Sequence, residues 1–192
     1  MTARSPDFEA MYAADPDPWK VRDSWYERRK QGVLLSLLAR ERYEHAWDAA
    51  CGTGALALAL SHRCARVTAT DASPRAVALT ADVLSGTPHA TALVNRLPEL
   101  PPLEGAPDLV VLAEVLYYLP EEERSRCLDA VVAVADDDPE VVVVHWRHHP
   151  DDAFLSGAAA TEEAGARLSR RGWERRTWHD DPDFVAASWV RP

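Results

Sequence analysis

Cysteine is scarce in this chain: Cys51, Cys64 and Cys127 are the only three among 192 residues. Their number is odd and no pair has C-x-x-C spacing, so the sequence predicts neither a disulfide framework nor a zinc ribbon. We also expect no metal site, because the histidines within residues 145–149 have no acidic partner at a diagnostic spacing. A reducing cytoplasm suits such a chain best.

Long apolar runs and excess positive charge are also missing. No stretch of about 18 apolar residues occurs, so the sequence predicts no membrane span, and the acidic N-terminus lacks the layout of a secretory signal. With 21 Lys and Arg against 31 Asp and Glu, the net charge is −10. Binding nucleic acid requires neutralisation of phosphates, so this balance argues against a nucleic-acid partner. We expect a cytoplasmic protein with a small-molecule substrate, and the sequence does not predict its oligomeric state.

What the chain does contain is a strand, a glycine turn and a helix in succession. The apolar segment from Ala46 to Ala50 predicts a strand, Gly52 and Gly54 follow in the turn, and a helix continues beyond them. Glycines let the backbone turn tightly and approach a ligand closely. A second predicted strand ends on Asp71, where an acid is placed to accept hydrogen bonds from ribose hydroxyls. This pattern indicates a site for an adenosine-containing cofactor.

Strands and helices alternate along the rest of the chain. The last two strands are joined by residues 180–183, a link too short for a crossover, so we expect an antiparallel hairpin. The sequence predicts an α/β fold, a doubly wound Rossmann-like sheet of seven strands, mostly parallel with a closing antiparallel hairpin and preceded by an N-terminal helix. We expect one domain over 1–192, with 1–45 as an N-terminal lid and substrate segment and 46–192 as the cofactor-binding core. Predicted strands are 46–50, 66–70, 90–94, 109–113, 140–146, 173–179 and 184–190, and predicted helices are 24–40, 54–63, 73–85, 120–135 and 157–171.

The glycine turn is compatible with two cofactors. Residues 52–57 fit the G-x-G-x-x-(G/A) fingerprint of dinucleotide-binding proteins, so a short NAD(P)-dependent oxidoreductase is an alternative. Asp48 favours an adenosine-containing cofactor with a cationic amine over a dinucleotide, because a carboxylate just before the turn suits such an amine and would repel a pyrophosphate. The closing hairpin and the lack of room for a separate substrate domain favour the same cofactor.

Three motifs in order resemble the class I S-adenosylmethionine-dependent methyltransferases. Residues 48–54, D-A-A-C-G-T-G, resemble motif I, usually written (D/E)-x-G-x-G-x-G, with Ala50 in place of its first glycine. Residues 71–74 resemble the segment that carries the ribose-binding acid, and residues 108–119 resemble motif IV. A closer resemblance is to the NodS-like nodulation N-methyltransferases, and it rests on residues 17–19, 24–30, 114–119 and 145–148.

The resemblance implies cofactor-binding roles on two sides of the site. On the core side, the turn would lie against the methionine and ribose portions, and we expect the small side chain of Ala50 to be tolerated. From the first helix, Tyr26 and Arg29 would cover the cofactor as part of a lid, with Arg29 pairing the cofactor carboxylate, while Arg28 and Lys30 would face solvent. The core residues implied are Asp48 near the cofactor ammonium, Ala50, Gly52 and Gly54 in the turn, Asp71 at the ribose, and Ala72, Asn95 and Arg96 around the adenine.

The resemblance also implies a reaction. Glu114 and His145 are the candidates for accepting or orienting the proton of the methyl acceptor, and Tyr117, Trp146 and Arg147 would line the acceptor side. We expect N-methylation of a small-molecule amine, such as an amino sugar or another specialised metabolite. The alternatives are O-methylation, the oxidoreductase above, or a degenerate methyltransferase fold used as a binding subunit.

Overall fold

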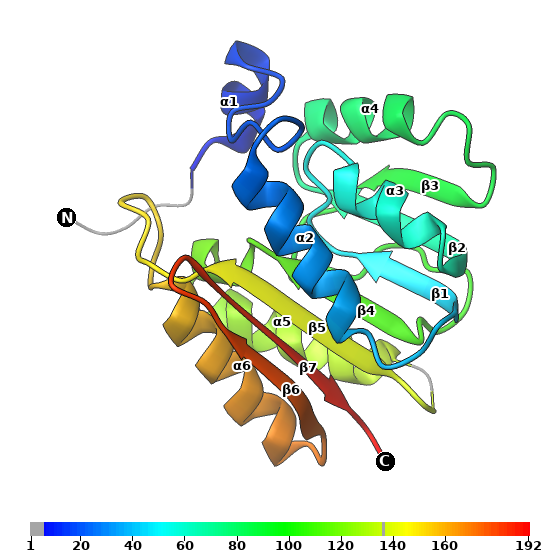
Figure 1. The fold of residues 1–192 in the computed structure, drawn as a ribbon, viewed down its shortest axis with the longest axis vertical. Helices are drawn as coiled ribbons and strands as arrows, with labels where there is room; N and C mark the ends of the chain where they lie inside the picture. The colour runs from blue at the N-terminus through cyan, green and yellow to red at the C-terminus, as the bar shows by residue number, and fades with distance from the viewer. Residues whose placement is uncertain (1–5, 136) are drawn as a thin grey trace.

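The computed structural model describes residues 6–135 and 137–192, and a seven-stranded sheet forms its centre (Figure 1). The strand order is β3-β2-β1-β4-β5-β7-β6. Strands β1 to β5 run parallel, and β7 lies antiparallel to both β5 and β6, which confirms the predicted doubly wound sheet with a closing hairpin. The strands are β1 Tyr43–Asp48, β2 Cys64–Asp71, β3 Ala90–Val94, β4 Leu109–Ala113, β5 Glu140–Trp146, β6 Glu174–Asp180 and β7 Phe184–Val190.

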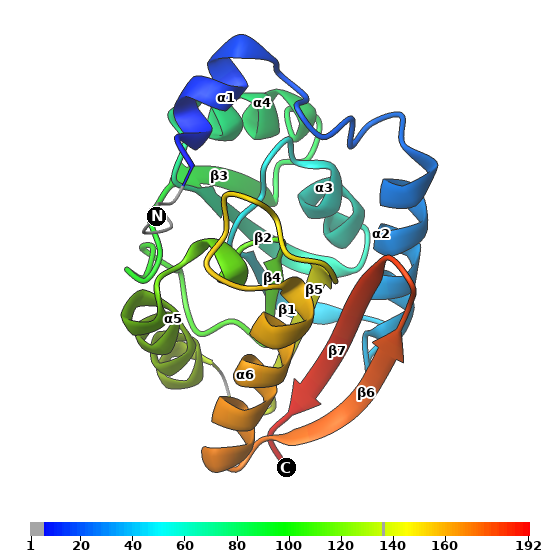
Figure 2. The same cartoon turned by 90° about the vertical axis from the view of Figure 1, so that its left-hand side faces the viewer.

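Helices cover both faces of the sheet. Helices α2, α3 and α4 lie on one face and α5 and α6 on the other, while α1 lies against α4 (Figures 1 and 2). Serine caps begin three of them, and Ser73 with Pro74 behind it starts α4 as the sequence predicts. The helices are α1 Phe8–Ala14, α2 Trp25–Leu37, α3 Ala55–Ser61, α4 Pro74–Val83, α5 Glu121–Val134 and α6 Gly157–Arg170, with one turn of 3-10 helix at Leu116–Tyr118.

The core consists of two apolar layers separated by the sheet. On the α2 and α3 side, Leu34 and Leu60 pack over Val111. On the other side, Leu128 and Leu168 belong to a second buried cluster that includes the indoles of Trp47 and Trp189. Strand β4 is covered on both faces, as its uninterrupted apolar run predicts.

The N-terminal segment differs most from prediction. The sequence predicted one helix before the sheet, whereas the structure has two, because α1 is only seven residues long and starts at an Asp7 cap without a clear apolar period. Residues 1–5 of the predicted segment 1–45 lie outside the described residues. Strand β1 starts at Tyr43, three residues before the predicted start at Ala46, so the predicted boundary at 45/46 falls inside a strand.

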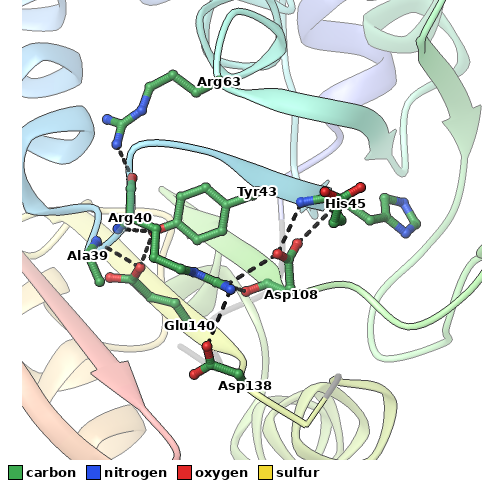
Figure 3. Close-up of polar contacts among 9 residues, drawn as sticks. Ala39, Arg40, Tyr43, His45, Arg63, Asp108, Asp138 and Glu140 are labelled. Carbon is green, nitrogen blue, oxygen red and sulfur yellow. Dashed lines mark hydrogen bonds and ion pairs between the residues drawn. The ribbon is translucent and has the colours of Figure 1, made fainter.

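A polar cluster at the amino end of the sheet explains where β1 starts (Figure 3). Both carboxylate oxygens of Asp108 accept backbone N–H groups, from Glu44 at 3.0 Å and from His45 at 2.8 Å. The buried carboxylate of Glu140, at the start of β5, accepts the hydroxyl of Tyr43. These bonds give the first residues of β1 their hydrogen-bond partners and hold the strand beside β4. They lie at the amino end of the sheet, opposite to the carboxyl ends of the parallel strands.

No helix among residues 6–135 and 137–192 has the length and apolar character needed to cross a membrane.

Candidate functional site

A cavity of about 620 Å³ opens at the carboxyl ends of the strands. The turn after β1, the end of β2 and the end of β4 line it, and this is where the strand order reverses between β1 and β4. Doubly wound sheets bind ligands at this position. The volume is within the range of pockets that hold a cofactor together with part of a second ligand. Helices α1 and α2 contribute the outer walls.

The turn after β1 depends on its two glycines. Gly52 has φ +53° and Gly54 φ +84°, conformations that residues with a side chain rarely adopt. A Cβ at Gly54 would lie 2.9 Å from Cα of Thr80, and one at Gly52 would lie 3.0 Å from the hydroxyl of Tyr12. Ala50 lines the cavity and is not among the described residues with positive φ, so its methyl group causes no backbone strain.

Asp71 ends β2 with its carboxylate fixed at the cavity wall. Oδ2 accepts the N–H of Gly52 at 3.0 Å, and Oδ1 accepts the N–H of Ser73 at 2.9 Å. Burial raises the pKa of Asp71, and these N–H groups offset part of the rise. Asp71 lines the cavity, so the acceptor positions that these bonds leave free are available to a ligand. The arrangement fits a pair of ribose hydroxyls.

The residues that follow β2 and β3 form the part of the cavity where the sequence predicts an adenine. Ala72, Asn95 and Arg96 line the cavity next to Asp71. The amide Nδ2 of Asn95 donates to the carbonyl of Glu99 at 2.7 Å, which leaves its side-chain oxygen as an acceptor. An exocyclic amine of a purine is the kind of donor that this oxygen would receive.

Asp48 lies behind the turn and not on the cavity wall. Its side chain is fully enclosed, and neither carboxylate oxygen has a hydrogen bond of normal geometry within the described residues. Burial, with a contribution from the charge of Asp71, raises the pKa of Asp48 to about 7, and the nearby N–H of Ala50 offsets only a small part. An enclosed carboxylate without a partner fits a cationic group bound at this turn.

Helix α2 forms the wall opposite the turn. Tyr26, Glu27, Lys30 and Gln31 line the cavity, and the Tyr26 hydroxyl is enclosed without a hydrogen-bond partner among the described residues. Lys30 is 7 % exposed, so the expectation that it faces solvent is wrong. The reason is that two carboxylates receive its ammonium group inside the protein.

The ammonium of Lys30 joins α2 to the end of β4. It donates to Oε1 of Glu27 at 3.0 Å and to Oε1 of Glu114. The other oxygen of Glu114 accepts the hydroxyl of Tyr117 and the backbone N–H of Trp146, the latter at 2.8 Å. Glu114 has φ +54°, a backbone conformation that residues with a side chain rarely adopt. The contacts of its carboxylate help to hold the residue in this conformation. Glu114, Tyr117 and Trp146 all line the cavity, next to one another.

His145 is fully buried beneath this wall and does not line the cavity. Its Nε2 accepts the backbone N–H of Leu116 at 3.2 Å, and its Nδ1 is 2.9 Å from the hydroxyl of Thr161. Burial lowers the pKa of His145 to about 4. With both ring nitrogens occupied, the expected role of His145 as a proton acceptor does not fit this geometry.

Two arginines expected at the site are held elsewhere. Arg29 binds the carboxylate of Asp181 with both terminal nitrogens, one at 3.1 Å. Arg147 pairs with Asp180 at 2.7 Å. Neither arginine lines the cavity, so the expected pairing of Arg29 with a cofactor carboxylate and the expected placement of Arg147 beside an acceptor do not fit. The acidic link between β6 and β7 attracts both guanidinium groups.

Sequence reasoning missed several residues that the structure brings to the cavity, among them Tyr12, Glu27 and Lys30. Tyr12 lies on α1, which carries no strong periodic signal. Glu27 has the spacing of the last residue of a capping box with Ser24, a pattern that predicts a helix start and no place in a cavity. Ser24 does accept the N–H of Glu27, at 3.4 Å, but the Glu27 carboxylate turns to Lys30. The i, i+3 spacing of the acid and the lysine was the available signal.

Comparison with known proteins identifies relatives of this chain. Residues 46–138 match a family model described as a methyltransferase domain. Nodulation protein S of Rhizobium tropici is 34 % identical over 115 residues, which are 59 % of this chain and 48 % of that protein. The match thus spans about half the length of these nodulation proteins.

Solved structures extend the likeness to most of the chain. A protein of Pseudomonas syringae assigned as a methyltransferase is 32 % identical with a TM-score of 0.74, over 88 % of this chain and 100 % of that one. The N-methyltransferase NodS from Bradyrhizobium japonicum WM9, in complex with S-adenosyl-L-homocysteine, has a TM-score of 0.81 at 21 % identity, over 96 % and 97 % of the two chains. Because a homologue above 30 % identity is matched along its whole length, and the family model covers the glycine turn and Asp71, this chain belongs to the class I S-adenosylmethionine-dependent methyltransferases.

Proposed function

We propose that this protein transfers the methyl group of S-adenosylmethionine to the nitrogen of a small-molecule amine. The observation that carries the proposal is that one cavity joins two different walls. One wall carries Asp71 and Asn95 for an adenosine, and the other carries the carboxylates of Glu27 and Glu114 together with Trp146. A cofactor and a cationic acceptor would therefore meet inside the same space.

The core residues would hold the cofactor at defined points. Asp71 would bind the ribose hydroxyls, Asn95 the adenine amine, and the charge of Asp48 would favour the cofactor ammonium close to the turn. When bound, the cofactor supplies a methyl group on a positively charged sulfur. The protein then has to align an acceptor with that methyl group and exclude water, and alignment of this kind accounts for much of the rate in such reactions.

The charge of the cavity favours an amine. Five carboxylates line it, from Glu27, Asp71, Glu114, Glu123 and Asp152, against the two cations of Lys30 and Arg96. Aromatic rings of the same lining add cation–π attraction for an ammonium group. A neutral hydroxyl acceptor gains little from this surplus of negative charge. An N-methyltransferase of the kind that NodS is described to be thus agrees with the lining.

We also propose that α1, α2 and the residues joining them cover the site and contribute to acceptor specificity, with the sheet and its remaining helices as the cofactor-binding core. Tyr12 and Tyr26 from this segment line the cavity. The side chain of Glu9 on α1 accepts the hydroxyl of Ser73 at 2.6 Å, next to the proposed ribose site.

Binding and turnover test the proposal. S-adenosylhomocysteine at a hundredfold excess over its Kd stabilises the native state by about 2.7 kcal/mol, which raises the Tm of a chain of this size by about 5–10 °C. Asp71→Ala should remove this shift, whereas the exposed Asp82→Asn should retain it. With labelled S-adenosylmethionine, ethanolamine, putrescine, tyramine and D-glucosamine serve as trial amines and catechol as a trial hydroxyl acceptor. Stabilisation by NADH but not by S-adenosylhomocysteine would contradict the cofactor, and transfer to catechol alone would contradict the acceptor class.

A further inference from the structure

Two carboxylates share the ammonium of Lys30, but their hydrogen-bonding states differ. Glu114 uses three of its four acceptor positions: one oxygen receives Lys30, and the other receives the Tyr117 hydroxyl and the Trp146 N–H. These donors come from three different elements of the chain. Glu114 is therefore a junction that holds α2 against the ends of β4 and β5.

Glu27 has most of its acceptor capacity free. Its Oε1 receives Lys30 at 3.0 Å, and among residues 6–135 and 137–192 its Oε2 has no hydrogen-bond partner. The side chain lines the cavity and is 16 % exposed. Lys30 and the helix fix the carboxylate in direction, and one oxygen remains available to a ligand.

The charges around Glu27 and Glu114 shift the pKa values of the two carboxyl groups in opposite directions. Lys30 and Tyr26 face Glu27 from α2, Glu114 faces it from the end of β4, and Asp17 faces it from the segment before α2. Burial raises the pKa of Glu27, Glu114 and Asp17 add to the rise, and Lys30 opposes it. For Glu114, burial acts in the same upward sense, but the positive charge of Lys30 and the donated hydrogen bonds hold its pKa below the usual value.

We propose that Glu27 is the catalytic residue that accepts the acceptor's proton, and that Glu114 is a positioning residue acting through Lys30. This inference rests on the proposed N-methylation. Oε2 of Glu27 first holds the acceptor as an ammonium ion, by charge and by one N–H···O bond. Glu114 remains ionised and keeps Lys30 against the other oxygen of Glu27.

The step balances without a further reactant. The ammonium nitrogen gives one proton to Oε2 of Glu27, which becomes a neutral carboxylic acid, and the nitrogen regains its lone pair. That pair forms the N–C bond to the methyl carbon while the C–S bond breaks, and the electrons of the C–S bond remain on sulfur. The positive charge passes from the sulfonium to the methylated nitrogen. Glu27 then releases its proton to water.

Glu27→Gln, Glu27→Asp and Glu114→Gln, with the exposed Glu122→Gln as the matched control, test the assignment on whichever trial amine is methylated fastest by the wild-type protein. Glu27→Gln should lower kcat by about 10²–10⁴-fold, with S-adenosylhomocysteine affinity within threefold of wild type. Wild-type kcat should rise with pH to a plateau as Glu27 ionises, and this break should be absent from Glu27→Gln. Glu27→Asp keeps a carboxylate and should retain the break while losing about tenfold in kcat.

Glu114→Gln should behave differently, because it leaves the proton acceptor in place. It removes a negative charge that raises the pKa of Glu27 and leaves Lys30 to Glu27 alone. The break in kcat should therefore move to lower pH, with a larger change in KM than in kcat. Glu122→Gln should match wild type in every measurement.

Three results would overturn the assignment. Glu27→Gln with kcat within threefold of wild type, or with the acidic break retained, shows that Glu27 does not take the proton. Loss of the break in Glu114→Gln assigns the proton to Glu114 instead. A failure of the proposed function looks different: the wild-type protein then binds no S-adenosylhomocysteine or methylates none of the four amines, and both proposals are refuted together.

Discussion

Replacing Asp48 by asparagine isolates the energetic effect of a buried charge that has no partner. The side chain is 0 % exposed and its oxygens lack hydrogen bonds of normal geometry within the described residues. Asparagine has nearly the same shape and carries no charge at any pH. The variant should therefore be more stable than the wild type whenever Asp48 is ionised, and equally stable when it is protonated.

The size and the pH range of the effect follow from the two pKa values. The carboxyl of an aspartate in an unfolded chain has a pKa of about 3.9, and that of Asp48 in the folded protein is about 7. Each pH unit between them corresponds to about 1.4 kcal/mol, so ionised Asp48 destabilises the fold by up to about 4 kcal/mol. Because the folded pKa is the higher one, the penalty is absent below about pH 4, grows up to about pH 7 and is constant above it.

Urea denaturation followed by tryptophan fluorescence measures this difference. The free energy of unfolding of Asp48→Asn should exceed that of the wild type by about 2–4 kcal/mol at about pH 8.5 and by nothing near pH 4. Asp82→Asn removes an exposed carboxylate and should show no such trend. An Asp48→Asn variant that is less stable than the wild type at alkaline pH would refute the reasoning, since the carboxylate would then have a stabilising partner in the folded protein.

The same variant links stability to binding. A cofactor ammonium near the turn would favour ionised Asp48, so wild-type affinity for S-adenosylhomocysteine should increase between about pH 6 and pH 8. Asp48→Asn should bind it about 10-fold more weakly at pH 8, from the loss of a charge-assisted interaction. Calorimetry in buffers of different ionisation enthalpy would show proton release on binding in the wild type alone.

Two further substitutions test the fold, the first at the amino end of the sheet and the second at the glycine turn of the site. Tyr43→Phe removes the hydroxyl that the buried carboxylate of Glu140 accepts, and it should lower the free energy of unfolding in urea by about 1–3 kcal/mol; no change would mean that this bond contributes nothing. Gly54→Ala places a methyl group 2.9 Å from Cα of Thr80 at φ +84°, and should lower the Tm and weaken S-adenosylhomocysteine binding, whereas Gly86→Ala, which meets no atom within 4 Å, should do neither.

The sequence predicts best the strands that are almost fully buried, because burial on both faces requires an apolar run. Residues 109–113, 140–146 and 184–190 were predicted with the bounds that the structure shows; the bounds of 90–94 were also correct, although that strand has no buried residue. Strands β4 and β5 are apolar runs covered on both faces, and such runs are well defined by composition alone. The start of β1 was missed because it depends on Asp108, more than sixty residues later in the chain.

The turn on the proposed cofactor side could be predicted from the sequence because its shape depends on local geometry. Gly52 and Gly54 need their unusual φ angles, and Asp71 ends a strand beside them. The acceptor side depends on which distant side chains meet. Arg29 lies next to Lys30 in sequence, yet Asp181 of the hairpin link holds the first outside the cavity, and Glu114 draws the second into it. No local pattern distinguishes these two neighbouring cations.

The contacts of Arg29 and Lys30 also bear on whether α2 can move. The sequence suggested a lid, but α2 is attached on several sides: Arg29 binds the β6–β7 link, Lys30 binds Glu114, and the amide of Gln31 donates to the carbonyl of Ala55 at 2.9 Å. These three attachments favour a fixed wall over a moving lid. The acceptor carboxylates are then preorganised before a ligand binds, which reduces the ordering that binding requires.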